Sequence, residues 1–267
     1  MVEYNAPIRD YDFLFNEMFD AIPIAQKLGY DFDTDFLSML TEGWGEHAKE
    51  VWLPINQLGD RKGLVFDNGS IKMPEEFKSA YNESIAGGWL STSCKPEHGG
   101  MGVPVFFQAV TWAEIGTSTN MAMSVLPALS LGVYDVLTEH GEKELVDYFA
   151  TKLASGKWAG TMCLTEPHAG TDLGIITTKA VSQDDGSYKV TGTKIFITYG
   201  EHDMTENIIH LVLAKTPGAP EGTKGISLFL VPKYLPSEWK SGGVKGLSHT
   251  LRTDHNGVTC SGSEEKM

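Results

Sequence analysis

The sequence has few cysteines and no surplus of basic residues, and both features narrow the possible functions. Cys94, Cys163 and Cys260 are far apart and form neither a C-x-x-C pair nor a regular disulfide framework. We therefore expect a reducing, cytoplasmic setting. Lysine and arginine number 21 against 35 aspartates and glutamates, which gives a formal charge of −14. Because such a surface repels a phosphate backbone, no nucleic-acid partner is expected.

Targeting segments and several common catalytic motifs are also missing. The first ten residues, MVEYNAPIRD, contain no apolar signal core, and no uninterrupted apolar run approaches the length that crosses a bilayer. We therefore expect neither export nor membrane insertion. The sequence contains no G-x-G-x-x-G, G-x-x-x-x-G-K-[ST], G-x-S-x-G or H-E-x-x-H. Nicotinamide, nucleotide-hydrolase, esterase and zinc-protease functions have little support, and no metal site is predicted.

In the first part of the chain, apolar residues recur at helical spacing. The pattern predicts helices over residues 11–22 (ended by Pro23), 36–53, 74–85, 105–115, 121–137 and 142–154. Residues 121–137 are apolar almost all round, which favours a buried helix. Gly156 is well suited to follow the last helix, since glycine tolerates the left-handed conformation at a helix end.

Beyond residue 158 the pattern changes to short runs rich in Val, Ile, Thr and aromatic residues. Strands are predicted over residues 175–181, 188–191, 194–198, 208–214 and 226–232, with a hairpin turn at Asp185-Gly186. The expected fold class is α+β, an all-helical domain followed by an antiparallel, barrel-like β-domain. We expect an N-terminal helical extension over residues 1–35, a helical domain over 36–157 and a β-domain over 158–267 that is truncated at its C-terminal end.

Two segments carry the strongest functional signal. Residues 162–173 read MCLTEPHAGTDL and residues 192–198 read GTKIFIT. They resemble the two flavin-binding segments of acyl-CoA dehydrogenases, in the same order and with a predicted hairpin between them. Residues 5–20 resemble the N-terminal extension of a long bacterial branch of that family. Its helical domain is similar to residues 87–89, to residues 96–100 with Gly102, and to Glu114-Ile115 followed by the predicted buried helix. The resemblance implies a helical domain, a β-domain and then a C-terminal helical bundle, which is absent from this chain.

The resemblance also implies roles for individual residues. A flavin that accepts a hydride needs donors at N1 and the C2 carbonyl, where charge accumulates, and Thr165 would supply them. Gly170 would let the backbone approach the cofactor closely, and Phe196 would cover one ring face. The residues expected to bind FAD are Met162, Leu164, Thr165, Gly170, Thr171, Phe196, Ile197 and Thr198. Thr171 is also expected beside the CoA substrate.

Plainer interpretations exist for some of these residues. Phe196 and Ile197 could be ordinary core residues of a strand, because alternating strands always carry aromatic and branched side chains. His168 stands where many members of the family have glycine. It is more readily a turn residue than a proton shuttle, because the sequence identifies no carboxylate partner for it.

The reaction implied by the resemblance is FAD-dependent α,β-dehydrogenation of an acyl-CoA to a trans-2-enoyl-CoA. The family's catalytic glutamate lies in the C-terminal bundle, so the base is expected beyond residue 267, and the 267-residue chain itself is expected to be inactive. Electron-transfer flavoprotein is the expected electron acceptor, and the full-length protein is expected to form a homodimer. An acyl-CoA oxidase that uses oxygen, and a non-catalytic paralogue that binds acyl-CoA or a partner, remain alternatives.

Overall fold

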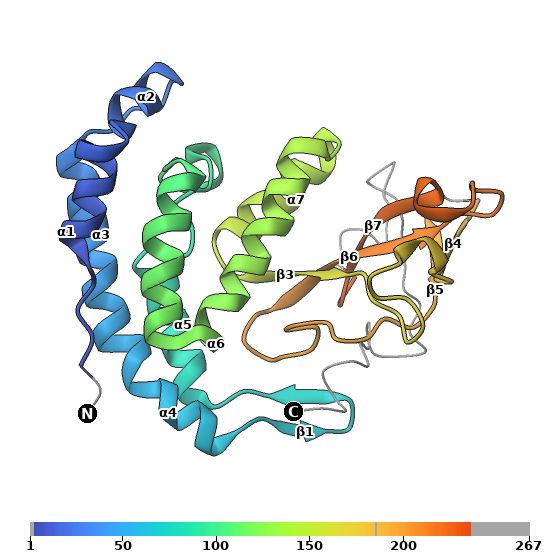
Figure 1. Ribbon diagram of the computed structural model, residues 1–267. Helices are drawn as coiled ribbons and strands as arrows, with labels where there is room; N and C mark the ends of the chain where they lie inside the picture. Colours follow the sequence, from blue (N-terminus) through green and yellow to red (C-terminus); the bar gives the residue numbers. More distant parts are fainter. Residues whose placement is uncertain (1–2, 185, 236–267) are drawn as a thin grey trace. The chain divides into compact units, whose positions relative to one another are not determined.

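The computed structural model describes residues 3–184 and 186–235, which fall into two compact units (Figure 1). The helical unit comprises the described residues up to Gly63 together with Pro74–Ala128. The sheet unit comprises Leu64–Met73 together with the described residues from Leu129 onward. The two units are described separately below.

The N-terminal helix is interrupted where a single continuous helix was predicted. Its parts are α1 (Ile8–Asp12), the π-helical turn η1 (Phe13–Met18) and α2 (Ala21–Lys27). The break falls at Asp20, whose φ of 47° lies in the left-handed region. Pro23 was predicted to end the helix, but it lies in the first turn of α2, where its missing N–H removes no helical hydrogen bond.

The predicted helix over residues 36–53 is confirmed and is longer than expected. It consists of α3 (Thr34–His47), the π-helical turn η2 (Ala48–Trp52) and α4 (Leu53–Lys62). The Asp33 side chain caps α3 by accepting the backbone N–H of Phe36 at 2.8 Å. Helix α5 (Glu75–Ala86) begins directly after Pro74, as predicted. A core of tryptophans fills the helical unit, with Trp44 and Trp112 stacked at a centroid distance of 5.1 Å.

Helix α6 (Val105–His140) contains both predicted helices, over 105–115 and 121–137. Between them Asn120 has non-helical dihedral angles, φ −157° and ψ 95°, and its side-chain oxygen accepts the N–H of Met123 at 3.1 Å. By length and composition α6 could cross a membrane, and 44% of its most apolar window is buried. It is the one such helix among the described residues, and this is weak evidence because core helices of soluble proteins pass the same test.

Two helices of the sheet unit pack on its first long strand, β3 (Trp158–Cys163). In the last part of α6, the Ser130 hydroxyl accepts the backbone N–H of Gly160 at 3.0 Å. Helix α7 (Lys143–Ala154) contributes Phe149, whose ring lies 5.8 Å from that of Trp158. Helix α7 matches the predicted helix, and Gly156 after it adopts a φ of 71°.

The main sheet is mixed, so the prediction of a purely antiparallel domain is wrong. Its other strands are β4 (Lys179–Ser182), β5 (Tyr188–Thr191), β6 (Asn207–Lys215) and β7 (Ile226–Pro232). Strand β6 pairs parallel to β3 and β4 and antiparallel to β7, while β4 and β5 form an antiparallel hairpin. Alternating side chains do not encode strand direction, and the long connection after β3 brings the chain back to start β6 at the same end. Among the described residues no pairing closes the sheet into a barrel.

Three short 3₁₀ turns complete the described elements: η3 (Pro96–His98), η4 (Leu173–Ile175) and η5 (Gly222–Gly225). The predicted strand over 175–181 is therefore partly wrong, because its first residue belongs to η4 and the strand begins at Lys179. The predicted hairpin between β4 and β5 is confirmed, although Asp185 itself lies outside the described residues. Gly186 in that turn has a φ of 81°.

A second, two-stranded sheet was not predicted. Strands β1 (Val65–Asp67) and β2 (Ser70–Lys72) pair antiparallel in the sheet unit. Asn68 and Gly69 form the turn between them, with φ values of 49° and 84°. Asn-Gly is the residue pair that a two-residue hairpin turn with two positive φ angles favours.

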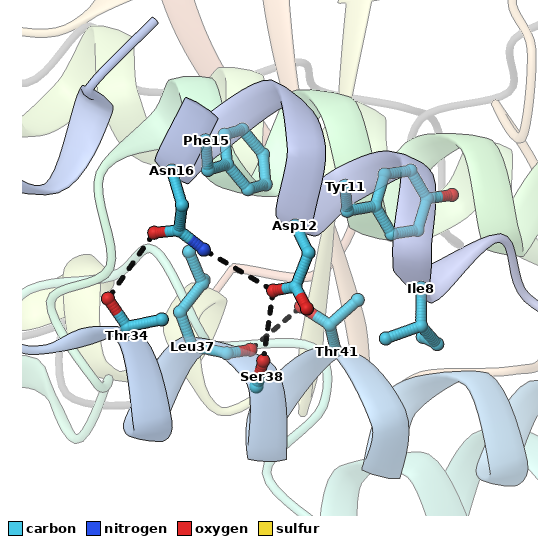
Figure 2. A pocket seen from close by; sticks show the side chains of 9 residues that line it. All are labelled: Ile8, Tyr11, Asp12, Phe15, Asn16, Thr34, Leu37, Ser38 and Thr41. Atoms are coloured by element: carbon cyan, nitrogen blue, oxygen red, sulfur yellow. Dashed lines mark hydrogen bonds between the residues drawn. The ribbon is translucent and has the colours of Figure 1, made fainter. Parts of the chain in front are cut away.

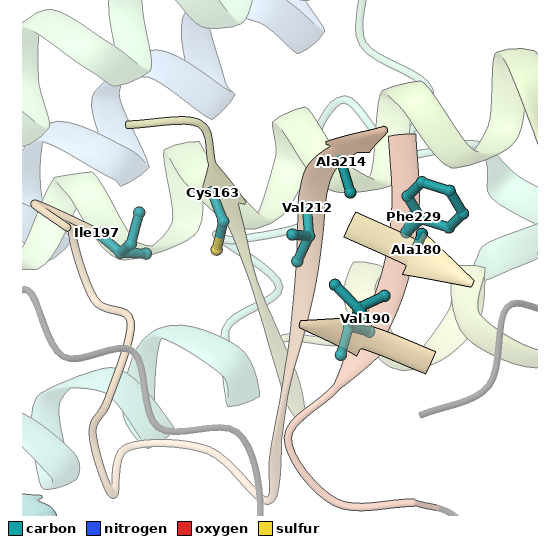
Figure 3. Packing of buried hydrophobic residues seen from close by; sticks show 8 residues of the cluster. Cys163, Ala180, Val190, Ile197, Val212, Ala214 and Phe229 are labelled. Atoms are coloured by element: carbon teal, nitrogen blue, oxygen red, sulfur yellow. The ribbon is translucent and has the colours of Figure 1, made fainter. Parts of the chain in front are cut away.

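The core of the sheet unit gathers side chains from all parts of the main sheet (Figure 3). Its buried members are Cys163, Ala180, Val190, Ile197, Val212, Ala214, Phe229 and Val231. Ile197 belongs to residues 194–198, which were predicted to form a strand and do not. In that segment Phe196 has a φ of 59°, and Tyr199 directly after it has a φ of 53°, both incompatible with an extended strand.

Candidate functional site

Thr165 lies directly after β3, and its carbonyl oxygen accepts the backbone N–H of Ile195 at 2.9 Å. This hydrogen bond joins the two segments singled out from the sequence, although many residues separate them along the chain. The end of β3 and residues 194–198 therefore lie side by side. The second segment is an irregular stretch of backbone, in place of the expected strand.

Glu166, the next residue, is a buried carboxylate with an unusually full set of donors. Its Oε1 accepts hydrogen bonds from Thr178 N (3.1 Å), Thr178 Oγ1 (2.5 Å) and Lys194 Nζ (2.9 Å), and its Oε2 accepts from Thr177 N (2.7 Å) and Thr177 Oγ1 (2.9 Å). Burial alone would raise the pKa of Glu166, but the hydrogen bonds from Thr178, Thr177 and Lys194 outweigh it and lower the pKa to about 2. The side chain is therefore ionised across the physiological range.

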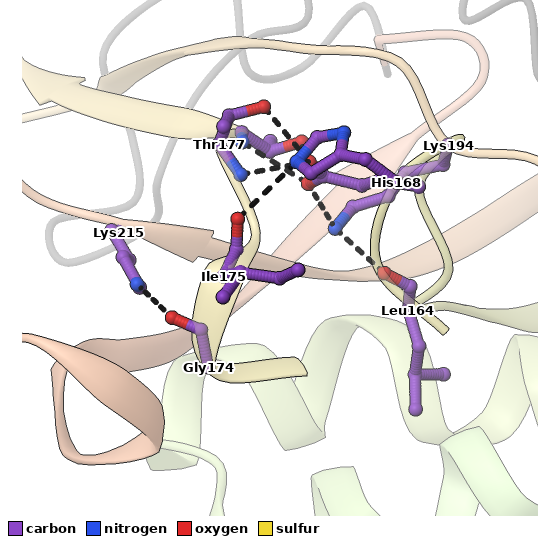
Figure 4. Close-up of polar contacts among 9 residues, drawn as sticks. Leu164, His168, Gly174, Ile175, Thr177, Lys194 and Lys215 are labelled. Carbon is purple, nitrogen blue, oxygen red and sulfur yellow. Dashed lines mark hydrogen bonds and ion pairs between the residues drawn. The ribbon is translucent and has the colours of Figure 1, made fainter. Parts of the chain in front are cut away.

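Lys194 makes contact on both sides of Thr165. Its Nζ donates to the backbone oxygen of Leu164 at 2.9 Å and to the carboxylate of Glu166 at 2.9 Å (Figure 4). The Lys194 side chain is 7% exposed and that of Glu166 is 1% exposed, so the ion pair is shielded from water. Together with the bond from Ile195 to Thr165, this fixes three consecutive residues of the first segment to two consecutive residues of the second.

The second segment begins with Gly192, which lies too close to Thr178 to carry a side chain. A Cβ at this position would lie 2.2 Å from Thr178 Oγ1, 2.7 Å from Thr178 Cβ and 2.8 Å from Thr178 Cα. The last of these is a backbone atom that cannot rotate away. Only glycine therefore permits the close approach that keeps Thr178 on the Glu166 carboxylate.

Residues 166–171 form a turn that is exposed at its tip. Glu166 and Ala169 exchange backbone hydrogen bonds of 2.9 and 3.0 Å across it. Gly170 and Thr171 are exposed, and a Cβ at Gly170 would meet open space. Among the residues that the structure describes, no atom lies close enough to require a glycine at position 170, in contrast to position 192.

His168 at the tip of this turn lies beside a carboxylate that the sequence did not reveal. Its Nε2 is 3.2 Å from the backbone oxygen of Ile175 and 3.6 Å from Glu166 Oε2. The carboxylate belongs to a residue two positions earlier in the chain, so the spacing gave no hint that the two side chains turn toward one another. These contacts agree with a turn residue.

The remaining predicted site residues divide by exposure. Phe196 is 60% exposed, and Thr198 is also exposed. Ile197 is 3% exposed and packs in the core, so only its backbone can face a ligand. Met162, Leu164 and Thr165 are half-buried. The plainer interpretation as a core residue is thus confirmed for Ile197 and wrong for Phe196.

Two buried histidines of the sheet unit, His202 and His210, were missed from the sequence. His210 on β6 lies 2.6 Å from Thr161 Oγ1 through Nδ1. His202 is 2% exposed, and its Nδ1 accepts the N–H of Met204 at 3.1 Å. Burial, together with the nearby charge of Lys233, lowers the pKa of His202 to about 3. Isolated buried histidines leave no periodic signal in a sequence.

A shallow pocket lies elsewhere, in the helical unit, between α1, η1 and α3 (Figure 2). Its lining residues are Ile8, Tyr11, Asp12, Phe15, Asn16, Thr34, Leu37, Ser38 and Thr41. Asp12 Oδ1 accepts from Ser38 Oγ at 3.2 Å and Asn16 Oδ1 accepts from Thr34 Oγ1 at 3.3 Å. Because these polar groups hydrogen-bond to one another, we interpret the pocket as part of the packing between helices and not as a ligand site.

The part of the chain that the structure describes contains no cluster of metal-ligating side chains. Across residues 3–184 and 186–235, no group of three or more His, Cys, Asp or Glu side chains is placed to hold a metal ion. The arrangement around Thr165 instead offers backbone groups, hydroxyls and one exposed aromatic ring. These suit a planar ligand with a polar edge.

Comparison with known proteins agrees with this site. Residues 161–261 match the acyl-CoA dehydrogenase middle domain. The chain is 42% identical over 249 residues to 3-methylmercaptopropionyl-CoA dehydrogenase of Ruegeria pomeroyi, covering 93% of this chain and 42% of that protein. It is 35% identical over 269 residues to a butyryl-CoA dehydrogenase of Syntrophomonas wolfei, covering 95% of this chain and 43% of the relative. The chain belongs to the acyl-CoA dehydrogenase family.

This chain shares its fold with solved structures of acyl-CoA dehydrogenases. An acyl-CoA dehydrogenase from Geobacillus kaustophilus matches with a TM-score of 0.62 at 24% identity, covering 77% of this chain and 50% of that one. An acyl-CoA dehydrogenase complexed with FAD from Bacillus anthracis matches with a TM-score of 0.60 at 21% identity, covering 76% and 31%. The chain spans less than half the length of the two curated relatives named above, 42% of one and 43% of the other.

Proposed function

We propose that the protein containing this chain catalyses FAD-dependent α,β-dehydrogenation of an acyl-CoA thioester, giving a trans-2-enoyl-CoA. The family membership and the names of the relatives, several of which are acyl-CoA dehydrogenases, support this reaction. The observation that carries it is the hydrogen bond from Ile195 to Thr165, which places the exposed Phe196 next to the half-buried end of β3.

The described residues fit a flavin. A planar ring system needs one exposed aromatic face and a polar edge, and Phe196 and Thr165 offer these on adjoining segments. Gly170 leaves open space at the exposed turn, where a pyrophosphate could approach the backbone closely. Phe196 holds a left-handed φ of 59°, a strained conformation for an aromatic residue, and such strain often marks a functional site.

We assign the residues as follows. Thr165 donates to the polar edge of the isoalloxazine, Phe196 covers a ring face, and Thr171 binds the pyrophosphate and lies beside the CoA chain. The full FAD-binding set is Met162, Leu164, Thr165, Gly170, Thr171, Phe196, Ile197 and Thr198, with Ile197 contributing its backbone. Bound FAD would accept the hydride from the substrate β-carbon while a base removes the α-proton. We further propose a β-domain that begins at residue 158, a cytoplasmic location, homo-oligomers and electron-transfer flavoprotein as acceptor.

The test uses the protein expressed from its complete open reading frame. Purified protein is expected to carry flavin absorbance, which acyl-CoA should bleach in the absence of oxygen, with formation of the enoyl-CoA. Reduction of electron-transfer flavoprotein would identify a dehydrogenase, and stoichiometric peroxide release would instead identify an oxidase. A protein that binds no flavin but still binds acyl-CoA would contradict the proposal and favour a non-catalytic paralogue.

A further inference from the structure

We propose that Glu166 and Lys194 form a charge-balanced positioning pair, which holds the two flavin segments together and sets the reduction potential of the flavin. This inference rests on the proposed function, because it places the polar edge of FAD at Thr165. Neither residue is in the set assigned above to touch the cofactor. The pair would act through the backbone that it fixes and through the charge that it brings close to that edge.

The first argument is positional. Lys194 Nζ binds the Leu164 oxygen and the Glu166 carboxylate, the groups before and after Thr165, at 2.9 Å each. The next residue, Ile195, binds Thr165 itself. A shift of the segment that carries Lys194 and Ile195 would therefore break its contacts to residues 164, 165 and 166. The same contacts thus fix the backbone of Thr165 and the position of Phe196, which directly follows Ile195.

The second argument is electrostatic. Both side chains are almost fully buried, so removal of one partner leaves a charge that water screens poorly. If Lys194 is lost, Glu166 keeps the four donors from Thr177 and Thr178 and stays ionised. If Glu166 is made neutral, Lys194 keeps the Leu164 oxygen as acceptor. Each single change therefore leaves a charge of opposite sign near Thr165.

The sign of each effect follows from where the flavin becomes negative on reduction. Negative charge accumulates at the N1 and C2 edge, which the proposed function places at Thr165. An unbalanced lysine cation there would stabilise the reduced cofactor and raise the midpoint potential. An unbalanced glutamate anion would destabilise the reduced cofactor and lower the potential. The native pair keeps the potential between these limits.

The experiment compares Lys194→Met, Glu166→Gln and the double variant in the FAD-loaded protein from the complete reading frame. We expect a lower midpoint potential for K194M, a higher one for E166Q, and a value near wild type for the double variant. We also expect FAD affinity to fall about tenfold or more in each single variant, because the two segments are no longer held together. A tenfold fall corresponds to about 1.4 kcal/mol of binding free energy. Fluorescence titration of the apoprotein measures it. Lys194→Arg keeps the charge and should retain the native potential.

A matched control removes another buried cation of the sheet unit. Lys233 binds Glu201 Oε1 at 2.6 Å, with side chains 9% and 4% exposed. Lys233→Met should destabilise the fold while weakening FAD binding less than K194M does. Equal weakening by both, or potentials that move in the same direction in K194M and E166Q, would overturn the positioning pair while leaving the proposed function intact. A wild-type protein that binds no FAD would overturn both.

Discussion

The backbone N–H of Ile195 donates to the carbonyl oxygen of Thr165 at 2.9 Å. This one bond brings together the two segments whose sequences resemble flavin-binding elements. Around it, the ion pair of Lys194 with Glu166 and the close approach of Gly192 to Thr178 fix the local backbone. The exposed groups, Phe196 and the turn at Gly170, stand on this fixed frame, which gives each of them a separable and testable role.

Gly192 and Gly170 are expected to respond differently to the same substitution. Gly192→Ala should lower the free energy of unfolding by about 1–3 kcal/mol, because the new methyl group overlaps Thr178. Gly170→Ala should leave it unchanged, since the methyl group would point into open space, and should weaken FAD binding. Urea unfolding and FAD titration of both variants measure this. Equal stability losses would contradict the assignment of Gly170 to ligand approach.

Phe196→Gly should stabilise the FAD-free protein and weaken FAD binding. Glycine adopts a φ of 59° without steric cost, and the left-handed conformation costs other residues about 1–2 kcal/mol. Phe196→Ala removes the same ring but keeps the strain, so it serves as the control. Urea unfolding should rank the glycine variant above the alanine variant. The reverse order would mean that Phe196 does not hold this conformation in solution.

Glu166 should make the protein sensitive to acid. Its pKa is lowered from 4.5 to about 2 in the folded state, so its stabilisation is complete above about pH 4.5 and is lost as the pH falls toward 2. The effect is on the order of 3 kcal/mol. In Glu166→Gln the stability should be lower at neutral pH and should fall less between pH 4.5 and 2. Unfolding curves with parallel pH dependence in both proteins would contradict the buried, ionised carboxylate.

His202 should act in a different pH window. Its pKa is lowered from 6.5 in the unfolded chain to about 3 in the folded protein. Between these two values the unfolded chain binds a proton that the folded protein does not. The free energy of unfolding therefore decreases as the pH is lowered through this range. His202→Asn preserves an acceptor for the Met204 N–H and should flatten the slope between pH 6.5 and 5. His47, whose pKa is also lowered by burial, keeps titrating in both proteins. An unchanged slope in H202N would show that His202 does not stay neutral.

Elements with strong local signals could be predicted from the sequence. Helices α5 and α7 begin and end near Pro74 and Gly156, because these residues restrict or permit specific dihedral angles. The break at Asn120 falls in the gap left between the predicted helices over 105–115 and 121–137, where residues 116–120 read GTSTN. Asn68-Gly69 is a recognised hairpin signal, so the pairing of β1 with β2 was predictable from the sequence.

The details of the site depended on contacts that the sequence does not record. Residues 194–198 have the β-branched and aromatic composition of a strand, but the bonds of Lys194 and Ile195 to residues 164–166 impose another path. Charged residues such as Glu166 are usually exposed, so no local pattern predicted its burial or its partner in a later segment. The direction of β3 relative to β6 was likewise set by the connection between them.

Hydrogen–deuterium exchange of the protein from the complete reading frame, with and without FAD, is the most direct test of whether the segments around Thr165 and Phe196 bind the flavin together. We predict that FAD slows amide exchange in peptides covering residues 162–172 and 194–199 together. Slower exchange in only one of these segments, or solely in other parts of the protein, would contradict the account.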